Sequence, residues 1–185
     1  MLTHLQFVGQ SGGSGRELRL VDEELGTLGE MFLSTFEKQL DAKRRIVVPQ
    51  EYRAALSGPA DGVFVFPSIR SDCIEGGGQA LFDRYGAMAD ELEFGDELRD
   101  SIERNVFGEM QKLSFDTAGR ITLPEQLCEQ YGISDWVAVV GLRDRFEIWE
   151  RDAYRAQRAA DRERARTGLA DMRAKQRAVR LGGAA

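Results

Sequence analysis

Histidine is almost absent from this sequence, which has His4 as its one histidine among 185 residues. Ser–His–Asp and Cys–His catalysis both need an imidazole base beside the nucleophile. Cysteine is also scarce, and Cys73 and Cys128 lack the spacing of a zinc site. We therefore expect no catalytic residues, no metal and no cofactor, and we interpret the two cysteines as small hydrophobic residues of the core.

Long hydrophobic runs are missing as well. No apolar stretch approaches the roughly 18 residues that a membrane-spanning helix needs. The first eight residues lack the basic and continuous apolar segments of a secretory signal. These absences predict a cytoplasmic protein with reduced thiols and no membrane partner.

Positive charge is in deficit over most of the chain. The net charge is −6, and residues 151–185 carry ten Lys and Arg against four Asp and Glu, a balance of +6. Residues 1–150 therefore carry 15 basic and 27 acidic groups, a balance of −12. This acidity argues against non-specific binding to polyanions. It is compatible with a protein that gathers its positive charge on one face and repeats that face by oligomerising.

What the sequence does contain is an internal repeat. Residues 40–49 and residues 115–124 share the pattern Asp-x-x-x-Arg-Ile-x-x-Pro, with four identities in the same register. In both copies an acid opens a short segment, an arginine closes it, and a brief apolar run follows that ends at proline. Such a match over ten residues indicates a duplication.

Each half of the chain is predicted to have the same order of elements. A strand, the acid-to-arginine turn, a second strand, a short helix that begins at the proline and a buried strand follow one another. We place the first half at residues 31–82 and the second at 110–150, with connecting helices at 83–109. Neither half has enough apolar surface to fold alone, so the fold class is mainly β with helices (α+β), with one core shared by two pseudo-symmetric repeats.

The two ends of the chain differ from this body. Residues 1–30 include a glycine- and serine-rich stretch and are predicted to be a disordered leader or a misassigned start. Residues 151–185 are rich in alanine and arginine and predict a long basic helix. That helix is solvated, contacts other copies of the chain, or clamps phosphate, and its interleaved acids favour the first two alternatives.

The repeated turn is the candidate functional feature. Asp41 and Asp116 are expected to fix their turns by accepting hydrogen bonds from backbone N–H groups two residues on, and Gly119 is free to adopt a positive φ. If the turns lie side by side, one face presents four cations suited to phosphate or guanine, namely Lys43, Arg44, Arg45 and Arg120. The alternative is that the two motif arginines form ion pairs with the two motif aspartates, and both arrangements can coexist.

With these residues the sequence resembles the MraZ family, over about residues 31–155. The resemblance rests on the duplicated motif, on Met31 and Phe32 before it, and on the aromatic segment 146–149. It implies an AbrB-like, double-psi-type swapped-hairpin barrel and a ring-like homo-oligomer. It also implies a nucleoid-associated transcription factor that binds double-stranded DNA at short direct repeats in its own promoter and regulates division and cell-wall genes. Arg44 departs from the family pattern, which commonly has glycine there, so the geometry of the first turn is open.

Other readings remain beside this one. The main alternative is an antitoxin-like module of the same fold. Such a module binds another protein through its basic helix and does not bind DNA. Gly76, Gly77 and Gly78 are not followed by the Lys-Ser or Lys-Thr of a phosphate-binding loop, so we assign them to a loop or a helix C-cap. Trp136 and Trp149 could stack on bases, but their strand positions favour the core.

Overall fold

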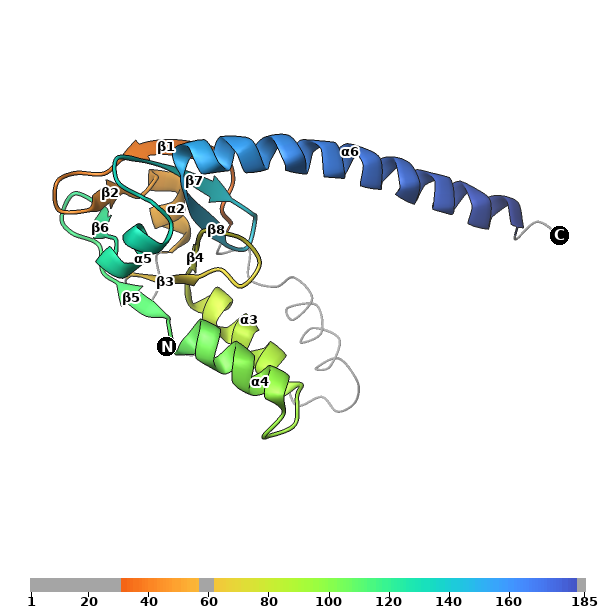
Figure 1. Cartoon of the computed structure of the whole chain (residues 1–185), viewed down its shortest axis with the longest axis horizontal. Helices are drawn as coiled ribbons and strands as arrows, with labels where there is room; N and C mark the ends of the chain where they lie inside the picture. The colour runs from red at the N-terminus through yellow and green to blue at the C-terminus, as the bar shows by residue number, and fades with distance from the viewer. Residues whose placement is uncertain (1–30, 57–61, 183–185) are drawn as a thin grey trace, which may run out of the picture.

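The protein was described from a computed structural model, which covers residues 31–56 and 62–182. The predicted leader, residues 1–30, lies outside the described residues. Two successive sets of strands, each with a short helix, form the body, two further helices lie between them, and a long helix ends the chain (Figure 1).

The first repeat contains β1 (Thr35–Gln39), β2 (Arg45–Val47), α2 (Gln50–Ala55), β3 (Val63–Pro67) and β4 (Ile74–Gly77). The second contains β5 (Gln111–Leu113), β6 (Arg120–Thr122), α5 (Glu125–Gln130), β7 (Trp136–Gly141) and β8 (Phe146–Glu150). Between them lie α3 (Gln79–Asp90), α4 (Glu97–Ile102) and a π-helical turn, η1 (Glu103–Phe107), and α6 (Arg151–Gly182) follows. Both short helices begin directly after a proline, as predicted, because proline pre-sets the backbone and cannot donate a hydrogen bond.

The two repeats exchange strands. Six antiparallel strands follow the order β1-β7-β8-β4-β3-β5, so that the first strand of each repeat pairs with the third strand of the other. The second strands, β2 and β6, pair with one another in a separate sheet. Neither repeat can complete its sheet without the other, and the predicted class, α+β with swapped repeats and a C-terminal helix, is confirmed.

The shared core is built around an aromatic group from both repeats. Phe32 and Tyr52 of the first repeat pack edge-to-face at 5.2 Å, and Phe32 packs on Phe146 of the second at 5.3 Å. All three rings are buried, and the Tyr52 hydroxyl donates a hydrogen bond of 2.8 Å to the Ser34 carbonyl. The polar atom of the core is therefore satisfied, as burial requires. Cys73, Cys128 and Trp149 are also buried, as predicted, whereas Trp136 is only partly buried.

The prediction for the glycine run was wrong for two of its three residues. Gly76 and Gly77 lie in β4, a buried strand between β3 and β8, and not in a loop, whereas Gly78 lies in the connection directly before α3. A Cβ at Gly76 would lie 2.7 Å from the ring of Phe146, and one at Gly77 would lie 2.9 Å from Leu81. Strands with consecutive glycines are unusual, and here the glycines make room for a large neighbour from another element.

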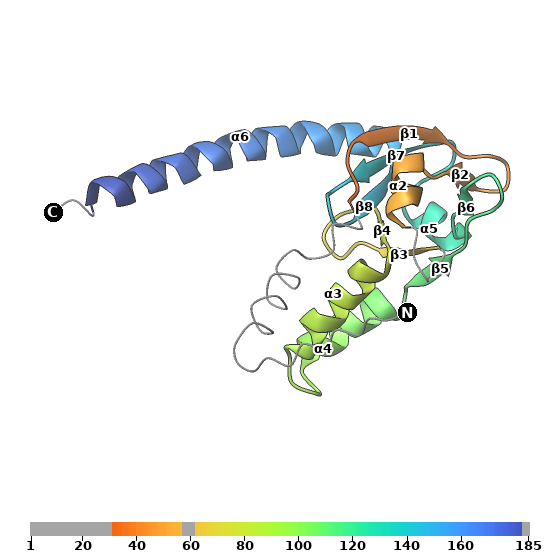
Figure 2. The same cartoon turned by 180° about the vertical axis from the view of Figure 1, so that it is seen from behind.

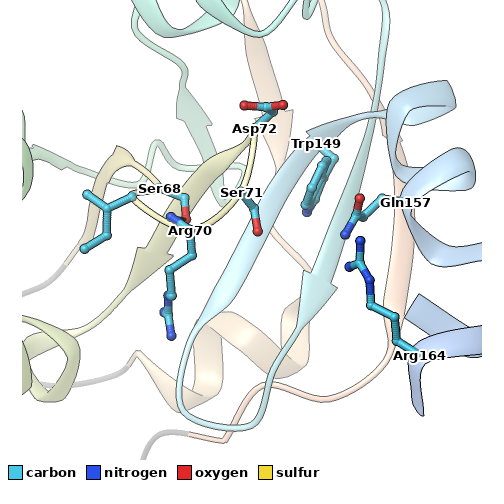
Figure 3. Close-up of a pocket in the computed structure, with 8 residues that line it drawn as sticks. Ser68, Arg70, Ser71, Asp72, Trp149, Gln157 and Arg164 are labelled. Carbon is cyan, nitrogen blue, oxygen red and sulfur yellow. Dashed lines mark hydrogen bonds between the residues drawn. The ribbon is translucent and has the colours of Figure 1, made fainter. Parts of the chain in front are cut away.

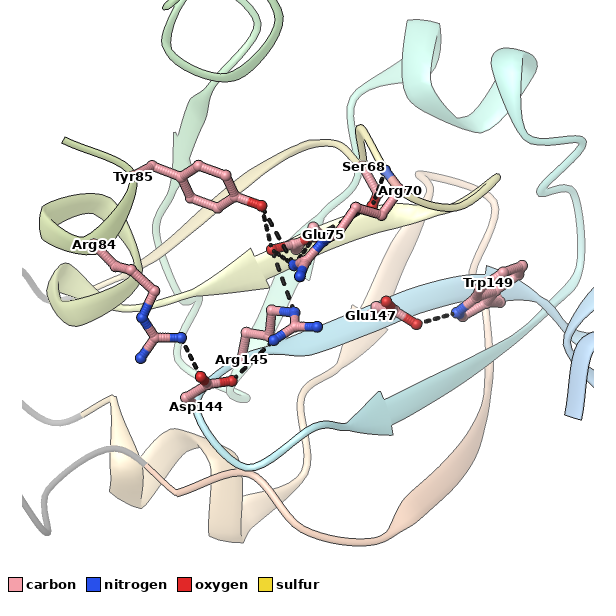
Figure 4. Close-up of polar contacts among 9 residues, drawn as sticks. All are labelled: Ser68, Arg70, Glu75, Arg84, Tyr85, Asp144, Arg145, Glu147 and Trp149. Atoms are coloured by element: carbon pink, nitrogen blue, oxygen red, sulfur yellow. Dashed lines mark hydrogen bonds and ion pairs between the residues drawn. The ribbon is translucent and has the colours of Figure 1, made fainter. Parts of the chain in front are cut away.

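A buried polar cluster joins β4 to α3 and to β8 (Figure 4). The side chain of Glu75 is completely buried and accepts hydrogen bonds from Tyr85, at 3.0 Å, and from Arg70. Arg145 lies 3.4 Å from the same carboxylate, and its own neighbour Asp144 pairs with Arg84 of α3. Glu75 and Asp144 both have cationic partners, so the cluster holds α3 against the sheet without leaving either carboxylate buried and unpaired.

Helices α3 and α4 form a hairpin on one side of the body (Figure 1). Asp96 caps α4, and its carboxylate accepts from the backbone N–H groups of Leu98 and Arg99. On the inner side, Leu81 and Tyr85 pack with Phe66 and Val106 in a second hydrophobic cluster.

Helix α6 extends away from the body as a single rod (Figures 1 and 2). Its first turns are attached, since Tyr154 packs near Trp149 and Arg155 pairs with Glu37 at 2.9 Å. Every described side chain from Arg158 to Arg177 is exposed. None of the described helices is both long enough and apolar enough to cross a membrane.

The close approach at Gly76 gives a stability prediction. Gly76→Ala should lower the free energy of unfolding by about 1 to 3 kcal/mol, because its new methyl group overlaps the Phe146 ring. Gly86→Ala is the matched control: it lies within α3 with open space around it, so it should raise that free energy by up to about 1 kcal/mol. Urea unfolding of both variants measures the difference, and equal stabilities would contradict the packing described for β4.

Candidate nucleic-acid interface

The two motif turns lie next to one another because β2 pairs with β6. Ile46 faces Ile121 at the centre of this short ladder, and both side chains are buried. Beyond the ladder, the N–H of Leu123 donates to the carbonyl of Arg44 at 2.9 Å, and the N–H of Val48 donates to the carbonyl of Gly119 at 3.1 Å. Each turn is thus hydrogen-bonded to the strand that leaves the other turn, in a two-fold arrangement.

Asp41 organises the first turn with both of its oxygens. Oδ1 accepts from the backbone N–H groups of Lys43, at 2.9 Å, and Arg45, at 3.0 Å. Oδ2 accepts from the Arg45 side chain, with Nε at 2.7 Å and Nη2 at 2.6 Å. One carboxylate therefore closes the turn and also fixes the direction of its arginine.

Asp116 does the same in the second turn. Its Oδ1 accepts from the N–H groups of Ala118 and Arg120, both at 2.9 Å. Its Oδ2 accepts from Arg120 Nε at 2.7 Å. The expected turn-fixing role of both aspartates is present in the geometry, with the same atoms in the same places.

The four charged groups form one cluster across the two-fold. Arg45 Nη1 lies 3.9 Å from Asp116 Oδ2, and Arg120 Nη1 lies 3.8 Å from Asp41 Oδ2. The ion-pair alternative left open by the sequence is therefore realised, and the cluster of two aspartates and two arginines is electrically neutral. Each of the four side chains keeps about a third of its surface exposed, from 28% to 34%.

These contacts lower the pKa of both aspartates. The pKa of Asp41 is held well below its usual range, first by the side-chain hydrogen bond from Arg45 and then by backbone N–H groups. The pKa of Asp116 is lowered chiefly by the backbone N–H of Arg120 and further by its guanidinium. Both carboxylates are charged at neutral pH, so each arginine has a permanent partner.

Arg44 adopts the conformation for which glycine is suited. Its φ is +58°, close to the +71° of Gly119 at the equivalent place in the second turn. In both turns the residue with positive φ donates its N–H to the carbonyl of the motif aspartate at 2.9 Å. The departure from the family pattern therefore leaves the turn geometry unchanged, at the cost of a strained arginine.

The cations of the turns differ in how far they are neutralised. Arg44 Nη1 lies 3.5 Å from Glu125 at the start of α5. Lys43 is exposed and, among the described residues, has no ion pair. The four predicted cations are thus close together, but only Lys43 is uncompensated.

Arg53 is a cation of this face that the sequence analysis missed. It lies on α2, its Nε donates to the Val48 carbonyl at 3.2 Å, and its guanidinium covers Gly119 so closely that a Cβ there would overlap it. Its position in the sequence, four residues after Pro49, could have indicated this. The start of α2 follows the first motif directly and must therefore lie close to the paired motif turns. The equivalent residue of the second repeat is Cys128, so this cation breaks the two-fold symmetry.

A groove lies elsewhere, between the 67–73 loop and α6 (Figure 3). Trp149 is at its base, and two arginines line it, one from the loop and one from α6. Arg70 already pairs with Glu75, and Arg164 with Asp161 at 2.9 Å. With Asp72 also in the lining, the groove has no surplus of charge that would select an anion.

The chain is similar to proteins of one family over most of its length. Residues 31–105 and 106–177 each match the family described as "MraZ protein, putative antitoxin-like". A protein of Phenylobacterium zucineum named "Transcriptional regulator MraZ" is 71% identical over 151 residues, which is 82% of this chain and 94% of that protein. Proteins of the same name from Caulobacter vibrioides and Rickettsia bellii are 62% and 42% identical, over 84% and 65% of this chain and 99% and 81% of theirs.

The strained arginine gives a second stability prediction. Arg44→Gly should raise the free energy of unfolding by up to about 1 kcal/mol, because glycine adopts positive φ without the steric cost. Gly119→Ala should lower it by about 1 to 2 kcal/mol, because it introduces that cost and displaces Arg53. Thermal unfolding of the two variants tests this, and a destabilised Arg44→Gly protein would mean that the contact with Glu125 outweighs the strain.

The lowered pKa values predict how stability depends on pH. Folding lowers the pKa of both motif aspartates from about 3.9, so their contribution is fully present above about pH 4 and is lost as the pH falls toward the lowered values. The Asp41→Asn/Asp116→Asn variant should therefore lose less stability than wild type between about pH 4 and pH 2. Urea unfolding across this range measures it, with Asp72→Asn as the control. Parallel curves for wild type and the double variant would contradict the prediction.

Proposed function

Because this chain belongs to the MraZ family, we propose that it is a transcriptional regulator that binds double-stranded DNA with its paired Asp-x-x-x-Arg turns. Its sites are short direct repeats in the promoter of its own gene, and the genes that it controls are those of division and cell-wall synthesis. This places its work in the cytoplasm, at the nucleoid. Relatives that are 62% and 71% identical are named as transcriptional regulators, which supports regulation rather than catalysis.

The observation that carries the proposal is the fixed orientation of two guanidinium groups. Each motif aspartate holds its arginine through Nε, and through Nη2 in the first turn, and the Nη1 groups lie almost 4 Å from the opposite carboxylate. An arginine has five N–H donors, so donors remain for phosphate or for the O6 and N7 atoms of guanine. Arg45 and Arg120 read the DNA in this proposal, and Asp41, Asp116 and the positive φ at Gly119 hold them in place.

Phosphate contacts come from the cations around this pair. Lys43 is exposed and Arg44 has only one distant carboxylate partner, so both can approach the DNA backbone. Arg53 adds charge beside the second turn. Phosphate contacts of this kind position a protein on the duplex, whereas base contacts give sequence specificity.

One copy of the chain offers little charge for this task, because the Asp–Arg cluster is neutral and the body is acidic. Affinity must then come from several copies bound to several repeats at once. Linking sites in this way raises the effective concentration of the second contact without any new interaction. A homo-oligomer, ring-like in our proposal, supplies that linkage.

The same neutrality favours the second candidate, an antitoxin-like module that binds a protein partner. A salt series separates the two. Binding to DNA through cations weakens steeply as salt is added, because counterions are released from the phosphates. A largely apolar protein interface lacks this dependence.

The proposal predicts the effect of removing the guanidinium pair. The Arg45→Ala/Arg120→Ala variant should bind DNA from upstream of its own gene at least about 30-fold more weakly, since each specific arginine contact contributes about 1 to 3 kcal/mol. Arg45→Lys/Arg120→Lys keeps the charge but not the planar fork, so it should lose specificity while the salt dependence stays. Fluorescence anisotropy measures both, with circular dichroism to confirm that the variants are folded.

The control removes the same charge elsewhere. Arg104→Ala/Arg143→Ala takes two exposed arginines from places outside the turns and should bind as wild type does. If the turn variant also binds as wild type does, the turns are structural and the basic α6 becomes the candidate surface. If neither wild type nor control binds, the protein-partner function is preferred.

A second prediction concerns the number of repeats. DNA with several correctly spaced repeats should bind at least about tenfold more tightly than DNA with one repeat, because linked sites cooperate. Changing the spacing by half a helical turn should remove this gain, since alternate sites would then face opposite sides of the duplex. Equal affinity for one repeat and for several would contradict multivalent binding.

A further inference from the structure

The outer part of α6 carries a basic face with an apolar centre. Arg158, Arg162, Arg166, Leu169 and Arg173 follow one another at spacings of three or four residues, so they share one face of the helix. Leu169 is 51% exposed, and its neighbour Met172, three residues on, is 53% exposed. Among the described residues, Arg158, Arg162 and Arg173 have no ion pair, whereas Arg166 pairs with Glu163.

The α3–α4 hairpin carries the opposite charge around an apolar centre of its own. Phe94, in the connection between the two helices, is 98% exposed, and Leu98 on α4 is 58% exposed. Glu91, Glu93 and Glu97 are exposed near them in the sequence and pair with no cation in the part of the chain that the structure describes. The ion pairs that the hairpin does form use Asp90, Asp100 and Glu103.

We propose that the outer half of α6 in one copy of the chain packs on the α3–α4 hairpin of a second copy. The unpaired arginines of the helix lie opposite the unpaired glutamates of the hairpin, and the two apolar centres cover one another. A phenylalanine exposed at the tip of a hairpin is the kind of side chain that fills a pocket or packs on a partner, because aromatic residues dominate interface energetics.

The outer part of α6 has its whole surface free for such a partner. Helices in proteins owe most of their stability to packing rather than to propensity, and α6 is exposed on all sides from Arg158 to Arg177. It extends from the top of the body in Figure 1, whereas the hairpin lies below, and Figure 2 shows the same separation from behind. The helix therefore does not contact the hairpin of its own chain.

The proposed contact joins two different surfaces, so it is head-to-tail. Each copy has one helix to offer and one hairpin to receive, and such contacts produce closed rings or open filaments rather than simple two-fold dimers. The biological role of this contact rests on the proposed function, because the contact would link the several copies that bind repeated DNA sites. Its physical basis and its test do not involve DNA.

Charge reversal tests the contact. The first variant, Arg158→Glu/Arg162→Glu/Arg173→Glu, has an acidic α6, and the second, Glu91→Lys/Glu93→Lys/Glu97→Lys, has a basic hairpin. In each variant alone the two surfaces repel one another, so half-assembly should need at least about tenfold more protein than for wild type. In an equal mixture every helix again meets a hairpin of opposite charge. The mixture should assemble as wild type does, as should a single chain that carries both sets of changes.

Analytical ultracentrifugation of wild type and of these four samples measures assembly. Glu51→Lys/Glu129→Lys, which reverses exposed charges on α2 and α5, is the control that should leave assembly unchanged. Phe94→Ser should weaken assembly without any change of charge. The proposal is overturned if wild type is monomeric, if either reversed variant assembles as wild type does, or if the mixture stays dissociated. Binding of wild type to promoter DNA is measured in parallel. A wild type that assembles but does not bind this DNA would refute the proposed function and leave the contact standing.

Discussion

The rest of the structure depends on a carboxylate that makes two kinds of hydrogen bond at once. In each motif turn one aspartate oxygen accepts from the backbone and the other accepts from the arginine four residues on. The turn cannot close without orienting the arginine, and the arginine cannot turn away without leaving a charge unpaired. Because β2 pairs with β6, two such units meet in a small sheet beside the six-stranded sheet that the two repeats build together.

This constraint is also why the turns could be predicted from the sequence. Asp41 and Asp116 have the spacing that an acid-opened turn requires, and short-range geometry depends on few residues. Arg44 shows how strongly the motif determines the turn, because an arginine adopts there the positive φ that favours glycine. What the sequence left open was the state of Arg45 and Arg120, because ion pairing and availability for DNA use the same side chains.

Long-range features were less accessible. The exchange of strands places β1 beside β7, more than 90 residues away, and no local pattern encodes that choice. The glycines of β4 follow from a ring that arrives from β8, so their strand character depends on packing and not on propensity. The distance of Arg53 from Pro49 places it near the turns, but its position over Gly119 is set by tertiary contact. The basic helix was predicted, but that it extends away from the body emerged only in three dimensions.

The central claim is that the oriented guanidinium pair is the surface that meets DNA. The most direct measurement is a nuclear magnetic resonance titration that follows the Nε–H signals of individual arginines as promoter DNA is added. The account predicts that the signals of Arg45 and Arg120 shift first and furthest, while those of Arg84 and Arg99, paired elsewhere on the molecule, stay in place. Shifts confined to the arginines of α6, with Arg45 and Arg120 unchanged in saturated complex, would contradict it.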